Sequence, residues 1–86
     1  MQLSRESRVA AAELIRAWMA GQADDALVIM RQHRIMEDPV AVEFVMATVR
    51  LATQAMLASA GYDVAKAVEL AEKLAQVEKK RADELP

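Results

Sequence analysis

The strongest constraint on the fold is the segment from Val40 to Ala60, which is predicted to form one helix with apolar residues on almost every side. Asp38 and Pro39 mark its start, because an acidic N-cap followed by a proline at the first helical position is a common helix beginning. Gly61 supplies a conformationally permissive stop. A single narrow strip interrupts the apolar surface, and it consists of Glu43, Ala47, Arg50 and Gln54. Such a helix has to be covered, either by its neighbours in the chain or by a second copy.

The composition limits the fold class to a single all-α domain over residues 1–86. The chain is 55% hydrophobic, which is too apolar for a disordered protein. It has only two glycines and two prolines, too few of these turn-forming residues for a turn-rich β fold. Apolar spacing and punctuation predict four helices, over about residues 4–20, 24–36, 39–60 and 63–82. We therefore expect a four-helix bundle built from two helical hairpins, with the long apolar third helix at its centre.

The charge and the lack of cysteine argue against several classes of function. Thirteen acids against eleven bases give a formal net charge of −2, so the chain has no general attraction to nucleic acid or to anionic membranes. Without cysteine it forms no disulfide, thiolate zinc site or cysteine nucleophile. Glu13 and Arg16 interrupt any signal-peptide core, and Arg50 lies midway along the apolar segment. We therefore expect no secretion signal, no membrane span and a cytoplasmic location.

His33 is the single histidine, so any acid–base or metal-binding role of an imidazole would require this residue. Together with Glu37, four residues later, it could form a metal site or a proton-transfer site. Two ligands are too few for a closed metal site, so we favour a structural interpretation, in which His33 simply lies near a carboxylate at a helix end. The acid pairs Asp24-Asp25 and Glu37-Asp38 are placed at predicted helix starts, where the helix dipole and capping favour acids. No phosphate-binding loop, nucleophile elbow or catalytic triad is present, so we expect no enzyme, no cofactor and no metal.

Two surfaces are candidates for binding. The wide apolar surface of the third helix predicts a homodimer, with a self-interface formed by Val45, Val49, Ala52 and Met56. A basic face on the first hairpin could meet phosphates or an acidic protein through Arg5, Arg16, Arg31 and Arg34. The acids interleaved with these arginines make solvated charge the simpler interpretation of that hairpin. The six methionines could form an adaptable groove, although helical core positions are the use that we favour.

These observations predict a non-catalytic protein–protein interaction module, such as a small adaptor, inhibitor or regulatory subunit. Its protein partner would bind a helical groove or the arginine-bearing hairpin. The alternative is a nucleic-acid-associated regulator that uses the four arginines. A catalytic or metal-dependent role through His33 comes third. If the third helix is enclosed within one chain, the binding site has to be sought among the charged residues instead.

Overall fold

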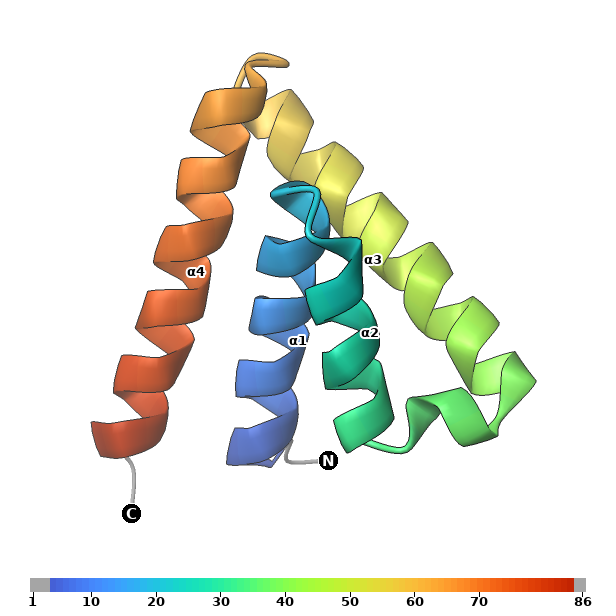
Figure 1. The fold of residues 1–86 in the computed structure, drawn as a ribbon. Coiled ribbons are helices and arrows are strands. Elements are labelled where there is room, and N and C mark those ends of the chain that lie inside the picture. The colour runs from blue at the N-terminus through green and yellow to red at the C-terminus, as the bar shows by residue number, and fades with distance from the viewer. Residues whose placement is uncertain (1–3, 85–86) are drawn as a thin grey trace.

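The computed structural model describes residues 4–84, and within them it contains four α-helices and no strand, which confirms the predicted all-α four-helix architecture. A short 3₁₀ helix, Ile35–Glu37, lies between the second and third of them. The helices α3 and α4 meet at one end and diverge from there, and α1 lies between them (Figure 1). The four helices are α1 (Arg5–Met19), α2 (Ala23–Gln32), α3 (Pro39–Ser59) and α4 (Val64–Glu84).

The starts of the two long helices follow from local sequence. At α3, Asp38 Oδ1 accepts a hydrogen bond of 3.0 Å from the backbone N–H of Val40, and Pro39 occupies the first helical turn. This is the N-cap and proline arrangement that the sequence predicted. At α4, Asp63 Oδ1 accepts a hydrogen bond of 3.2 Å from the backbone N–H of Lys66. In both cases an acidic side chain satisfies a backbone donor that the helix itself leaves without a partner.

The second helix ends earlier than expected, at Gln32 instead of near residue 36. Arg34 has a left-handed φ of 58°, which a right-handed helix cannot contain, and the chain then forms the Ile35–Glu37 3₁₀ turn before α3 begins. Left-handed backbone also reverses the chain between α3 and α4, where Gly61 has a φ of 66°. There a residue without a Cβ adopts the required conformation at no steric cost.

The middle of the bundle is occupied by α1 and not by α3. Helix α1 contacts each of the other three helices, whereas α3 contacts α1, α4 and the 3₁₀ turn. Within α3, which lies wholly in the described range, Val49 is the single buried residue. The third helix is as long and apolar as predicted, but its expected central position is wrong, because its neighbours cover one side of it. The main core is formed by Leu14, Ala17, Ala26, Met30 and Val49.

A second packing region joins α1 to α4 through small side chains. Ala67, Ala71 and Ala75 occupy successive turns of α4 and are exposed by 0%, 0% and 2%. Ala12 of α1 is buried at 4% exposure. Side chains of this size let two helix axes approach closely and interlock along their ridges. These small side chains are therefore withdrawn from water where the two helices meet.

Candidate interaction surface

The outer side of α3 carries large apolar side chains that the described part of the chain leaves uncovered. Val40, Phe44 and Leu51 are exposed by 74%, 73% and 66%. Single exposed apolar residues are normal on soluble proteins, but these three lie on one side of one helix. Residues of α1 and α2 form the core around Val49 on the opposite side of α3, and α4 also contacts α3. The outer side is therefore an apolar surface that none of the described residues covers.

The residues that the sequence predicted as a self-interface lie mainly on the other side of α3. Val49 belongs to the main core at 5% exposure, and Val45 packs against that core. Ala52 and Met56 are half-buried. As a correction, Val49 is committed to the chain's own core and cannot be the centre of an interface between copies. On a helical projection these four residues lie opposite the polar strip that contains Glu43. Their place on the helix therefore indicated that they face the interior of the chain.

Two apolar hollows flank α3 and extend its exposed surface. The first lies between α1 and α3, has a volume of about 190 Å³, and is lined in part by Ile15 and Phe44. Phe44 thus forms both the rim of this hollow and part of the outer side of the helix. The second hollow, of about 440 Å³, lies between α3 and α4 and is lined by Ala55, Met56, Ser59, Leu70 and Leu74. Shallow apolar concavities beside an exposed helix are typical of surfaces that accept another helix.

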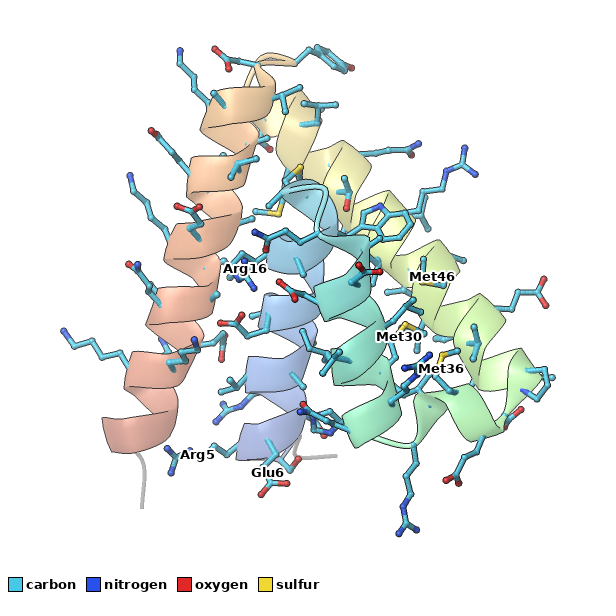
Figure 2. All side chains as sticks on the ribbon, viewed as in Figure 1. Arg5, Glu6, Arg16, Met30, Met36 and Met46 are labelled. Atoms are coloured by element: carbon cyan, nitrogen blue, oxygen red, sulfur yellow. The ribbon has the colours of Figure 1, made fainter. Side chains whose placement is uncertain are left out.

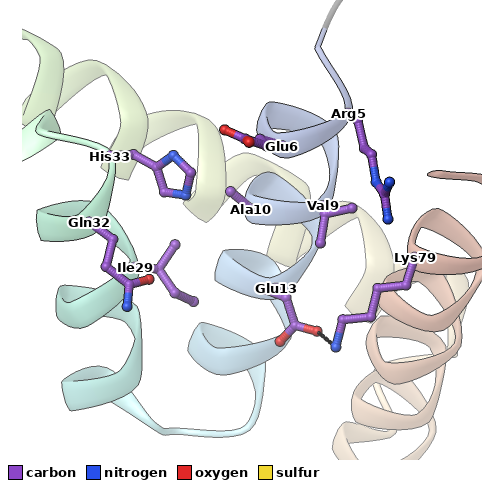
Figure 3. Close-up of a pocket in the computed structure, with 9 residues that line it drawn as sticks. All are labelled: Arg5, Glu6, Val9, Ala10, Glu13, Ile29, Gln32, His33 and Lys79. Atoms are coloured by element: carbon purple, nitrogen blue, oxygen red, sulfur yellow. Dashed lines mark ion pairs between the residues drawn. The ribbon is translucent and has the colours of Figure 1, made fainter. Parts of the chain in front are cut away.

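A groove of about 440 Å³, lined by both charged and apolar side chains, runs over α1 between α2 and α4 (Figure 3). It is lined by Ile29 and Gln32 of α2, by His33 directly after α2, and by Lys79 of α4. Within the described residues, no hydrogen bond or ion pair joins His33 to Glu37, and no three acidic or histidine side chains are grouped closely enough to hold a metal ion. The predicted His33-Glu37 pair is thus not brought together as a bonded site.

Glu13 is the most strongly held charge in this groove. Its carboxylate forms an ion pair with Lys79 of α4 and accepts a 2.8 Å hydrogen bond from Arg16 Nε (Figure 3 shows the Lys79 pair). Burial by itself raises the pKa of the Glu13 carboxyl, but the hydrogen bonds and positive charges of Lys79 and Arg16 outweigh it and lower the pKa. The ion pair therefore connects α1 to α4 at the rim of their alanine interface.

The four candidate arginines do not form one continuous face. Arg5 and Arg16 lie at opposite ends of α1 (Figure 2), eleven residues apart, which corresponds to about 16 Å along a helix axis. Arg31 and Arg34 lie at the end of α2, beside the start of α1 and so on the side of Arg5. Arg16 also donates a 3.0 Å hydrogen bond to Gln22 Oε1. The structure brings three of the arginines to one end of the hairpin and holds the fourth in local contacts at the other.

Helix α3 also meets the length and hydropathy criteria of a membrane-spanning helix. It has 21 residues, and its most apolar window has a mean hydropathy of 1.4 with 6% of the window buried. Core helices of soluble proteins reach the same length and hydropathy, but such helices are mostly buried and α3 is not. Arg50 lies near the middle of α3, where a charge at the centre of a bilayer costs about 2.5–3.5 kcal/mol. A position of α3 across a bilayer would therefore carry this cost at Arg50.

Comparisons with known proteins gave no matching family model, no similar curated protein and no similar solved structure.

Proposed function

We propose that this chain is a non-catalytic helical interaction module that binds protein through the outer side of α3. The observation that supports the proposal is the 73% exposure of Phe44, in line with the similarly exposed Val40 and Leu51 on the same helix. Removing apolar surface from water is the dominant favourable term in most protein–protein association. An adaptor, inhibitor or regulatory subunit of this size would act by presenting such a surface.

The nucleic-acid alternative lacks an observation of comparable weight. A phosphate-binding face needs several cations that converge on one strand or groove. Arg16, however, is already hydrogen-bonded to Glu13 and Gln22, and it lies at the far end of α1 from Arg5. The uncovered apolar surface of α3 is the more specific feature.

Site-specific photo-cross-linking in living cells that express the protein tests the proposal. A benzoylphenylalanine replaces Phe44, and a matched control replaces Gln76, which is exposed on α4. We expect discrete protein adducts from position 44 that are absent from position 76. We also expect Leu51→Arg to abolish them, because a charge in the centre of the apolar surface is costly to bury. Adducts with lipid alone, or protein adducts equally frequent at both positions, would contradict the proposal.

A further inference from the structure

The exposed apolar residues of α3 repeat with the spacing of a coiled-coil seam. From Val40 onward they follow one another in alternating steps of four and three residues along the exposed side of the helix. A repeat close to 3.5 residues allows one helix to lie along another over several turns. We name this set the α3 seam, and its members are Val40, Phe44, Ala47 and Leu51.

The protein exposes more surface than a compact chain of its mass. Its accessible surface is 6228 Å², whereas a folded monomer of 9.5 kDa exposes about 5,000 Å². Its Cα radius of gyration is 13.0 Å, against about 12 Å for a compact chain of this length. The surplus is about 1,200 Å², and each partner of a stable complex buries about 800 Å². One interface of ordinary size would remove most of the surplus.

The charges beside the α3 seam are complementary to themselves. Glu43 and Arg50 are the two charged residues of α3, they lie seven positions apart on the same edge of the seam, and both are exposed. In the part of the chain that the structure describes, neither forms an ion pair. If a second α3 lies antiparallel, Glu43 of each copy is placed across from Arg50 of the other. In a parallel pair, Glu43 would lie across from Thr48 and Arg50 across from Ala55, so both charges would be unmatched.

We propose that two copies of this chain pair through their α3 seams, antiparallel about a two-fold axis close to residues 45 and 46. This inference rests on the proposed function and names a second copy as the partner. In this register Phe44 of each copy packs over Ala47 of the other, and Leu51 meets Val40. The large side chain fills the space above the small one, which is the knobs-into-holes arrangement of a helix pair. Two reciprocal ion pairs, Glu43 to Arg50, close one edge of the interface.

Charge exchange at the two edge positions tests both the pairing and its direction. Sedimentation analysis of the full chain at low ionic strength should show a dimer. Glu43→Arg and Arg50→Glu should each raise the dimer Kd about tenfold or more, because each creates two like-charge contacts. An equimolar mixture of the two variants should regain the dimer mass, because a chain with two positive charges then meets one with two negative charges. The control Lys73→Glu, an exposed change on α4, should leave the Kd within twofold. Far-UV circular dichroism checks that each variant keeps its helices.

Three results would overturn the pairing: a wild-type chain that is monomeric at every concentration, edge variants that leave the Kd within twofold of wild type, or a mixture that fails to restore the dimer. A monomeric wild type that still forms discrete adducts with another protein from position 44 would overturn self-pairing and leave the proposed function standing. A monomer without protein adducts from position 44 would remove both.

Discussion

Helices α3 and α4 have the same length, 21 residues each, but they use their side chains in opposite ways. The sequence of α4 is mixed and charged, yet it buries an alanine in three successive turns against α1. The sequence of α3 is apolar almost throughout, yet Val49 is its single buried residue and Phe44 is 73% exposed. Burial within the chain therefore follows the shape of the contacting faces more closely than it follows hydropathy.

The difference separates two roles for apolar residues in this molecule. In α4, small side chains let the helix approach α1 closely, so a modest apolar area is fully withdrawn from water. In α3, one side completes the main core, and the outer side remains available after folding is complete. We infer that α4 stabilises the folded chain and that the outer side of α3 stabilises a complex. This contrast leads to three predictions about stability.

The largest expected effect is at the alanine interface. Ala71→Leu should lower the free energy of unfolding by about 2–3 kcal/mol, because a close-packed helix contact has no room for three more carbons. Ala65→Leu, an exposed position on the same helix, should change it by less than about 0.5 kcal/mol. Urea unfolding followed by circular dichroism at one protein concentration measures both. If Ala71→Leu proved as mild as Ala65→Leu, the α1–α4 contact would be looser than the burial of Ala71 indicates.

The sequence predicted the fold class and the start of α3, because Asp38, Pro39 and the apolar repeat act locally. It did not predict which helix lies at the centre. Alanine contributes little to a hydropathy pattern, so the deeply buried Ala67 and Ala71 gave no sign that α4 would be held so closely. The predicted self-interface on α3 included Val49, which the structure places in the chain's own core. The polar strip through Glu43 predicts that the opposite side of α3 faces the chain's own core, and Val49 lies there.

An intermediate effect is expected at the ion pair beside the alanine interface. Because the pKa of Glu13 is lowered in the folded protein, its ionised form stabilises the fold at pH values above the ordinary range of a glutamate. This contribution is lost as the pH falls through the lowered pKa. Glu13→Gln should therefore reduce the free energy of unfolding by about 0.5–1 kcal/mol at neutral pH, a modest amount because water screens the half-exposed Lys79.

The difference between wild type and Glu13→Gln should narrow as the pH falls below the ordinary range of a glutamate, and it should close once the pH has passed through the lowered pKa of Glu13, where the carboxyl is neutral in the folded protein as well. Urea unfolding at several pH values measures it, and Glu72→Gln, an exposed change on α4, serves as the control. A difference that stays constant from neutral pH to pH 3 would show that Glu13 contributes by packing and not by its charge.

The smallest expected effect in the isolated chain is at the outer side of α3. Leu51→Gln should change the free energy of unfolding by less than about 0.5 kcal/mol in dilute solution, because Leu51 is 66% exposed. Val49→Ala, in the same helix but in the core, should cost about 2 kcal/mol. A large cost for Leu51→Gln at the lowest concentration would mean that the chain itself covers this side. If its cost instead grows with protein concentration, the cover comes from association, because binding stabilises the folded state by mass action. Concentration dependence at Leu51 and its absence at Val49 would then distinguish surface buried on folding from surface buried on association.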